Sequence, residues 1–262
     1  MYNLAAQSSV HLSFENPLST MKSVGLGVIN LLEAVRLVDK SIKVFQASSS
    51  EIFGKTETFP QNETTLVHPC SPYATAKLVA FHSIRMYREA YGLRAYSGIL
   101  FNHESPRRGE NFVSQKIVKA VVRIKYGRQA SLELGNLDAR RDWGHARDFV
   151  KCIWAIMQHD EPDDFIVATG KTYTVRDFVT LAFEAVGIKV LFRDEGLKEI
   201  GVNERTGKTL VTVNPKFFRP LEPTLSVGDA SKARIQLKWE TEMNLKEMIH
   251  EMVMACESRY QH

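Results

Sequence analysis

Hydrophobic and polar positions follow two periodicities that alternate along the chain. Short apolar runs rich in β-branched and aromatic residues are separated by longer stretches whose apolar residues recur at helical spacing. This alternation is typical of βαβ units that build a mostly parallel sheet. The short runs predict strands over residues 2–6, 42–47, 94–101 and 165–168. The longer stretches predict helices over residues 20–38, 73–91, 113–126, 146–158, 175–186 and 245–259.

The composition fits a globular α/β protein with a sizeable core. The chain has 262 residues, of which 44% are hydrophobic and 24% charged. Its net charge of +4 is spread without long basic runs, so we expect no nucleic-acid partner. There is no apolar run of membrane-spanning length, and no basic stretch leads into an apolar segment at the start. We therefore expect no membrane association and no standard signal peptide.

Cysteine and histidine usage gives no sign of a structural metal or of disulfides. The cysteines, Cys70, Cys152 and Cys256, are odd in number and far apart, with no Cys-x-x-Cys spacing. The 8 histidines are scattered, so we expect no metal site. Together these features indicate a reducing compartment and predict a cytoplasmic protein.

The first candidate for chemistry is a Tyr-x-x-x-Lys sequence at the start of a predicted helix, formed by Tyr73 and Lys77. A spacing of four residues places the phenol and the ammonium on one helix face. The ammonium can then lower the pKa of the tyrosine from its usual value of about 10 and make it a usable base. Taken alone, such a pair is more often structural, because one is expected by chance in a chain of this composition.

The second candidate is a polar run that follows the strand predicted over residues 42–47, and it includes Ser49 and Glu51. Ligands of open α/β sheets lie beyond the carboxyl ends of the strands, so this hydroxyl and this carboxylate are placed to meet a substrate. A strand-to-loop junction with a capping serine explains the run equally well. The separation of 22 residues between Glu51 and Tyr73 favours the catalytic interpretation.

Together the two motifs resemble the extended short-chain dehydrogenase/reductase superfamily. Its active site pairs a Ser or Thr at the end of one strand with a Tyr-x-x-x-Lys on the following helix. Nucleotide-sugar 4,6-dehydratases carry a Glu two positions after that hydroxyl, whereas sugar-nucleotide epimerases usually do not. Glu51 stands at this position. Since dehydration needs a base for the C5 proton, the extra carboxylate has a chemical reason.

Longer strings of residues are similar to the signatures of one family, the GDP-mannose 4,6-dehydratases. The two most specific strings cover residues 101–113 and 134–146. Shorter matching strings lie at residues 160–165, 218–222, 228–229 and 237–239. The resemblance therefore extends over nearly the whole chain.

The resemblance implies a lyase that converts GDP-mannose to GDP-4-dehydro-6-deoxy-mannose and water, the first step of de novo GDP-fucose synthesis. Tyr73 would take the 4-OH proton while a hydride passes from C4 to tightly held NADP. Lys77 would lower the tyrosine pKa and hold the cofactor ribose. Glu51 would remove the C5 proton and expel the 6-OH with help from Ser49, after which the hydride would return to C6.

The resemblance also implies binding residues and partners. His103, Arg108 and Lys77 are the expected NADP contacts. The loop of Arg107 and Arg108 is expected to reach a neighbouring subunit in a homodimer or homotetramer. The positions expected to contact GDP-mannose are Asn102, Val113, Lys116, Gly135, Arg141, Arg219 and Glu222. Arginine forks suit diphosphate oxygens and a glutamate suits guanine, although a single arginine is more often a solvated surface charge.

The expected fold is an NAD(P)-binding, Rossmann-like α/β structure. It consists of a doubly wound parallel sheet that lacks its first strands, followed by a smaller mixed α/β substrate lobe. We expect residues 1–108 to form a partial NADP-binding domain to which residues 145–170 return. Residues 109–262 would form mainly the nucleotide-sugar lobe.

The chain departs from the family pattern in three respects. Ser49 stands where the family usually has Thr, and Phe53 stands where it usually has Tyr. A Tyr that contacts the cofactor in the family falls near Leu18 and Ser19. No Gly-rich phosphate loop follows the first predicted strand. A shortened gene model or transcript is therefore expected as readily as a genuinely short protein.

Two other functions remain open. The first is a catalytically inactive fragment or pseudoenzyme that binds nucleotide sugar or pairs with full-length subunits, and that binds no NADP by itself. The second is an epimerase or reductase that acts on another nucleotide sugar. Glu51 and the string over residues 135–145 disfavour the second.

Overall fold

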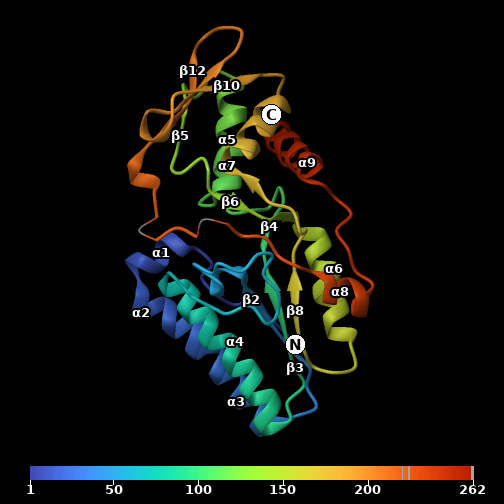
Figure 1. The fold of residues 1–262 in the computed structure, drawn as a ribbon. Coiled ribbons are helices and arrows are strands. Elements are labelled where there is room, and N and C mark those ends of the chain that lie inside the picture. Colours follow the sequence, from blue (N-terminus) through green and yellow to red (C-terminus); the bar gives the residue numbers. More distant parts are fainter. Residues whose placement is uncertain (220, 224, 261–262) are drawn as a thin grey trace.

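The larger of two lobes is built on a parallel sheet (Figure 1). The computed structural model describes residues 1–219, 221–223 and 225–260. The sheet has four strands in the order β1-β2-β3-β8. Their bounds are β1 (Tyr2–Asn3), β2 (Val44–Ser49), β3 (Ala95–Leu100) and β8 (Asp164–Val167). All three pairings are parallel, which confirms the sheet expected from the apolar runs.

Helices cover both faces of this sheet, as a doubly wound fold requires (Figure 1). One face carries α3 (Gly27–Val38) and α4 (Pro72–Tyr91), and the other carries α6 (Ala146–Gln158) and α8 (Ser231–Leu237). Successive strand residues point to opposite faces. Val44 accordingly belongs to the core beside α3 and α4, whereas Phe45 belongs to the core beside α6.

The helix predicted over residues 20–38 is part of a longer helical stretch. It follows α1 (Val10–Glu15) and consists of α2 (Pro17–Thr20), a π-helical segment (Met21–Leu26) and α3. Gly25 lies in the π-helical segment, where a Cβ would lie 3.1 Å from Met21 Sδ and 3.6 Å from the Ala76 carbonyl. A Cβ at this position would therefore make only ordinary contact with α4, and its one tight contact would be with the flexible end of Met21.

The smaller lobe combines a mixed sheet with three helices. Its sheet has the order β10-β11-β12-β5, formed by β10 (Val190–Arg193), β11 (Ile200–Asn203), β12 (Thr209–Val213) and β5 (Leu132–Leu134). Its helices are α5 (Val113–Lys125), α7 (Val175–Glu184) and α9 (Leu245–Glu257). The sequence predicted the helices but none of these strands. No helix in the described part of the chain is long and apolar enough to cross a membrane.

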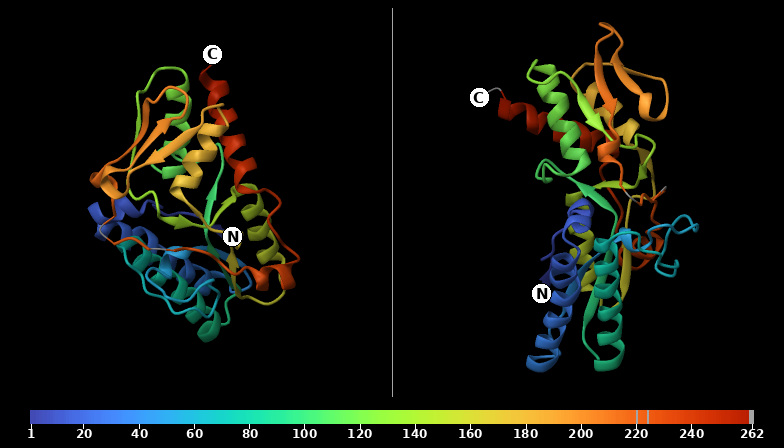
Figure 2. Two further views of the ribbon diagram at one scale, coloured as in Figure 1. Left: turned by 45° about the horizontal axis from the view of Figure 1, so that its top comes forward. Right: turned by 90° about the vertical axis from the view of Figure 1, so that its left-hand side faces the viewer.

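Two short strand pairs connect the lobes. β4 (Asn102–Glu104) pairs in parallel with β7 (Trp143–His145), and β6 (Arg140–Arg141) pairs antiparallel with β9 (Tyr173–Thr174). After β12 the chain crosses between the lobes to α8 and then returns to α9 (Figures 1 and 2). The Asp142 carboxylate fixes this crossing, because it accepts hydrogen bonds from the backbone N–H groups of Thr169, Gly170 and Gly228.

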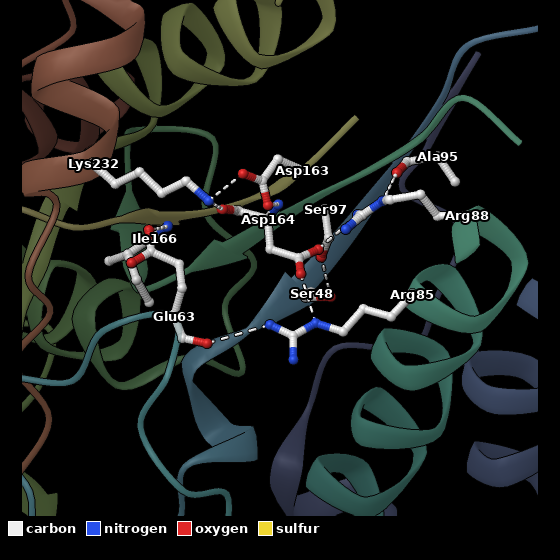
Figure 3. Close-up of polar contacts among 10 residues, drawn as sticks. All are labelled: Ser48, Glu63, Arg85, Arg88, Ala95, Ser97, Asp163, Asp164, Ile166 and Lys232. Carbon is white, nitrogen blue, oxygen red and sulfur yellow. Dashed lines mark hydrogen bonds and ion pairs between the residues drawn. The ribbon is translucent and has the colours of Figure 1, made fainter. Parts of the chain in front are cut away.

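A buried carboxylate ties α4 to the larger sheet (Figure 3). Asp164 begins β8, and its side chain is only 4% exposed. Its two oxygens accept hydrogen bonds from Arg85 Nε at 2.6 Å and Arg88 Nη2 at 2.8 Å. Arg88 Nε also donates to the Ala95 carbonyl at the start of β3. Both arginines belong to α4, so the carboxylate ties this helix to β8 and the second contact of Arg88 ties it to β3.

We expect Asp164→Asn to lower the free energy of unfolding by about 2 to 3 kcal/mol, because it leaves two arginines without their anion. The value is below that of a fully buried pair, since Arg85 is 35% exposed. The neighbouring Asp163→Asn is the control, because Asp163 is 41% exposed and its one ion pair among the described residues is with Lys232. It should change the free energy by less than about 1 kcal/mol. Urea unfolding of both variants measures the difference, and equal losses would contradict the account.

Candidate active site

The candidate catalytic residues meet at the carboxyl edge of the larger sheet. Ser49 is the last residue of β2, and its hydroxyl accepts a hydrogen bond from the Glu51 backbone N–H at 3.3 Å. This bond caps a 3₁₀ turn (Ser50–Ile52) that carries Glu51. The helix α4 begins beside it, where Ser71 caps the first turn and Pro72 occupies the first helical position. Tyr73 is thereby placed next to the end of β2.

Tyr73 is buried beside Ser49. It is 7% exposed, and the Ser49 hydroxyl lies close enough to affect its pKa. Burial raises the pKa of Tyr73 to about 12, against the lowering effects of the Ser49 hydroxyl and of the Arg108 charge. The negative charge of Glu51 raises it further. In the free chain Tyr73 is therefore a protonated phenol at neutral pH.

Lys77 lies one helical turn after Tyr73, on the same face of α4 as expected. Its Nζ is 5.7 Å from the centre of the Tyr73 ring and donates a hydrogen bond to the Ala47 carbonyl at 2.7 Å. Burial lowers the pKa of Lys77 to about 8. The sequence led us to expect that Lys77 lowers the tyrosine pKa. In the free chain burial instead dominates both groups, and it shifts each toward its neutral form.

His103 and Arg108 lie beyond the end of β3, near Tyr73. Burial lowers the pKa of His103 to about 4, so the imidazole is neutral. Its Nδ1 lies 2.8 Å from the Phe101 carbonyl, and its ring stacks on Phe149 with centroids 5.0 Å apart. Because Nδ1 donates to this carbonyl, Nε2 is left as an acceptor.

Arg108 is held between an anion and an aromatic ring. Its Nε lies 3.0 Å from Glu104 Oε2, at an angle that makes the contact an ion pair rather than a hydrogen bond. Its guanidinium carbon lies 3.5 Å from the centre of the Phe112 ring. Glu104 is 2% exposed and also accepts a hydrogen bond from Ser114 Oγ at 2.7 Å. A buried carboxylate thus fixes the cation that acts on Tyr73.

A chain of alternating charges runs from Glu51 into the smaller lobe. Arg219 Nη1 donates a hydrogen bond to Glu51 Oε1 at 3.2 Å, and Arg219 Nε lies 4.0 Å from Glu222 Oε2. Glu222 is ion-paired in turn with Arg141, which also donates to the Pro223 carbonyl at 3.2 Å. Three residues expected to contact substrate are therefore linked to the candidate base.

The remaining expected substrate contacts lie in two parts of the structure. Asn102 lines a narrow cavity of about 10 Å³ together with Glu51 and Arg141. Lys116 lies in α5 of the smaller lobe, and its Nζ is 3.4 Å from the centre of the Phe217 ring. At Gly135 a Cβ would lie 2.5 Å from the Phe217 carbonyl, so the close approach requires glycine. Val113 begins α5 and is 39% exposed.

The sequence did not single out several residues that shape this site. Phe217 contacts both Lys116 and Gly135, since its ring lies against Lys116 Nζ and its carbonyl lies against Gly135. Gln61 ties the loop that follows the 3₁₀ turn to residues 227–229. Its side chain accepts a hydrogen bond from Val227 N, and its carbonyl accepts one from Asp229 N. Neither residue belongs to a catalytic motif, so the sequence offers no local signal for them. Glu104 lies inside the string over residues 101–113, where it could have been suspected.

Within the described residues, no group of three or more His, Cys, Asp or Glu side chains is arranged to hold a metal ion. The three cysteines are free and buried. Burial raises the pKa of the Cys70 thiol, and the neighbouring Glu51 charge adds to this effect.

Comparison with known proteins identifies the relatives of this chain. A family model described as GDP-mannose 4,6 dehydratase matches residues 1–252. A GDP-mannose 4,6-dehydratase of Sinorhizobium fredii is 49% identical over 255 residues, which are 97% of this chain and 73% of the relative. The Homo sapiens and Drosophila melanogaster GDP-mannose 4,6 dehydratases are 46% and 45% identical over 97% of this chain, which covers 69% and 65% of their lengths.

Solved structures share the fold. A UDP-glucose 4-epimerase of Thermotoga maritima, determined with UDP-glucose, has a TM-score of 0.80 at 25% identity, and the match covers 99% of this chain and 77% of that one. RMD from Pseudomonas aeruginosa, complexed with NADPH, has a TM-score of 0.84 at 24% identity over 98% of this chain and 81% of that one. These matches confirm the Rossmann-like α/β fold expected from the sequence.

The low pKa of Lys77 predicts a pH-dependent stability of the free chain. Between pH 8 and its usual pKa of 10.5, Lys77 is deprotonated in the folded chain and protonated in the unfolded chain. The unfolded state then binds more protons, so stability rises with pH by about 3 kcal/mol over this interval. Lys77→Met should lose this rise relative to the wild type, whereas Lys55→Met on the exposed loop should keep it. Denaturant unfolding at several pH values measures how stability changes with pH in each protein. Parallel profiles for all three proteins would contradict the lowered pKa of Lys77.

Proposed function

The chain belongs to the GDP-mannose 4,6-dehydratase family, whose reaction is that of a hydro-lyase, and we propose that four side chains at one edge of its larger sheet carry this reaction. They are Ser49, Glu51, Tyr73 and Lys77. The product would be GDP-4-dehydro-6-deoxy-mannose, formed with release of water.

The observation that carries this assignment is the position of Glu51. It follows the strand-end hydroxyl of Ser49 by two residues, and its negative charge is close enough to Tyr73 to raise the tyrosine pKa. A site that only oxidises and reduces a sugar at C4 needs the hydroxyl, the tyrosine and the lysine. The second base is useful when a proton must also leave C5 and water must leave C6.

Each catalytic residue has a distinct task in this proposal. Tyr73 begins the step as a phenolate, takes the proton of the 4-OH and becomes a neutral phenol, and the Ser49 hydroxyl favours the starting phenolate because it lowers the tyrosine pKa. A protonated Lys77 near the ring favours the same phenolate. Once C4 is a ketone, Glu51 accepts the acidified C5 proton and protonates the departing 6-OH. The free chain keeps Tyr73 protonated, so the active ionisation state must be established on assembly of the complex.

We propose NADP as the cofactor, held by Lys77, His103 and Arg108. When bound, it would accept the hydride from C4 and return it to C6. The residues fit this role in the described structure. Lys77 uses one donor on the Ala47 carbonyl and retains two for ribose hydroxyls, and His103 presents a neutral ring nitrogen. Arg108 supplies a fixed positive charge for a phosphate. A nicotinamide cofactor is further supported by the RMD structure with NADPH.

We propose GDP-mannose as the substrate, bound where these residues of the two lobes come together. Arg219 and Arg141 supply guanidinium groups for the diphosphate, and Glu222 is placed among them to accept hydrogen bonds from guanine. Asn102 and Lys116 offer further polar groups on the two sides. Gly135 and Val113 would shape the wall without charge.

The arrangement of cores supports the expected division into domains. Residues 1–108 with residues 145–170 contribute to the larger sheet and its helices, whereas residues 109–262 supply most of the smaller lobe. α8 is an exception, because it packs on the larger sheet. We also propose a homodimer or homotetramer, supported by the Arg107 and Arg108 loop, and a cytoplasmic location, supported by three free cysteines.

Glu51→Gln should reduce water elimination by about a hundredfold or more, because an amide cannot accept the C5 proton. Mass spectrometry of GDP-mannose and NADP⁺ with the variant measures this loss. Exchange of the C5 hydrogen in D₂O, followed by NMR, should fall in parallel. Glu57→Gln on the exposed loop after the 3₁₀ turn is the matched control and should retain both. Full turnover by Glu51→Gln would remove Glu51 from its assigned role.

A further inference from the structure

Arg219 and Glu51 form an ion pair in the free chain, although the two residues have different tasks in the proposed reaction. We propose that the diphosphate of the nucleotide sugar takes Arg219 away from Glu51 and thereby frees the carboxylate to act as the base. The inference rests on the proposed function, because it needs Glu51 as base and a nucleoside diphosphate sugar as substrate.

The guanidinium of Arg219 donates few hydrogen bonds to the described residues. Among the described residues it donates one hydrogen bond, from Nη1 to Glu51 Oε1 at 3.2 Å. Its Nε lies at 4.0 Å from Glu222, too far for a hydrogen bond. Because guanidinium offers five donors in a planar fork, a single long contact leaves most of its capacity unfilled. Arg219 is therefore free to exchange this contact for a better acceptor.

Arg141 differs from Arg219 in this respect. It is 7% exposed and donates to the carbonyls of Arg140 and Pro223 besides its ion pair with Glu222. These contacts fix its guanidinium in the wall of the cavity. Of the two arginines in the charge chain, Arg219 is thus the one whose partner can change at little cost.

The carboxylate of Glu51 is also incompletely paired. One oxygen accepts the hydrogen bond from Arg219, whereas Oε2 is buried without a hydrogen-bond partner in the described part of the chain. A buried acceptor without a partner is unfavourable, so this arrangement is less stable than a fully satisfied one. The pair is held mainly by charge, and a second anion can compete for it.

A diphosphate is the kind of anion that would win this competition. Phosphate oxygens match the guanidinium fork and accept two parallel hydrogen bonds, whereas the Glu51 contact supplies one. Once Arg219 turns to the diphosphate, Glu51 loses the cation that neutralises it and its carboxylate can take up a proton. Binding of the nucleotide part would in this way prepare the base that acts on the sugar part.

The test is a double-mutant cycle on binding of GDP, which lacks the sugar and therefore cannot react. Isothermal titration calorimetry measures the dissociation constant for the wild type, Glu51→Gln, Arg219→Gln and the double variant. Glu51→Gln should bind GDP roughly three- to tenfold more tightly, because the competitor for Arg219 is gone. Arg219→Gln should bind more weakly, and adding Glu51→Gln to it should give no gain.

Two further variants keep the test independent of folding. Arg205→Gln, in the exposed turn after β11, should bind GDP like the wild type. Arg219→Lys keeps the charge without the fork, so Glu51→Gln should tighten its binding less than it tightens the wild type.

GDP affinity that is unchanged or weaker in Glu51→Gln would overturn the competition and leave the proposed function standing. A gain that persists without Arg219 would overturn it as well, because it would arise from general charge repulsion. If neither the wild type nor Glu51→Gln binds GDP, the proposed substrate fails and the inference fails with it.

Discussion

The parallel register of β2 and β3 determines where the chemistry of this protein can lie. Ser49 pairs with Leu100, so the two longest strands of the larger sheet end at the same level. The residues that follow each strand, Glu51 in one case and His103 in the other, are therefore delivered to one edge. The helix α4 starts at that edge and adds Tyr73 and Lys77. A shift of the register by one residue would turn these side chains to opposite faces of the sheet.

Burial controls the electrostatics of the site. It keeps Tyr73 protonated and weakens the affinity of Lys77 for its proton, so each group is shifted away from the charged form that the reaction uses. The charged residues are instead matched in pairs: Glu104 with Arg108, Glu51 with Arg219 and Glu222 with Arg141. The free chain thus combines a neutral Tyr73, a weakened ammonium at Lys77 and paired ions. Ligands must change this balance to produce an active arrangement.

The sequence predicted the larger lobe well because its helices are long and strongly periodic. The helices α4 and α6 begin within a residue of the expected positions, and the parallel strands follow the apolar runs. The strands of the smaller lobe were missed; β10 ends in Arg193 and β11 contains Gly201, which weakens the local strand pattern. Their pairing depends on the core shared with α5 and α7, which local patterns do not reveal.

The site could be predicted in part. The Tyr-x-x-x-Lys spacing and the strand-end hydroxyl placed Ser49 and Tyr73 together, since both depend on local geometry. The contact of Arg219 with Glu51 joins positions 168 residues apart and could not be read from the chain. The raised pKa of Tyr73 was likewise hidden, because it depends on the side chains that bury the ring. Local motifs predict which side chains lie close together, whereas the packing around them determines their protonation states.

The central claim is that these side chains carry an internal hydride transfer coupled to loss of water. It is tested most directly with GDP-mannose that bears deuterium at C4, incubated with the purified chain and NADP⁺. Mass spectrometry should show a product lighter by one water that retains the deuterium, and NMR should place the label at C6. An intact sugar nucleotide with a folded chain, or a dehydrated product that has lost the label, would contradict the account.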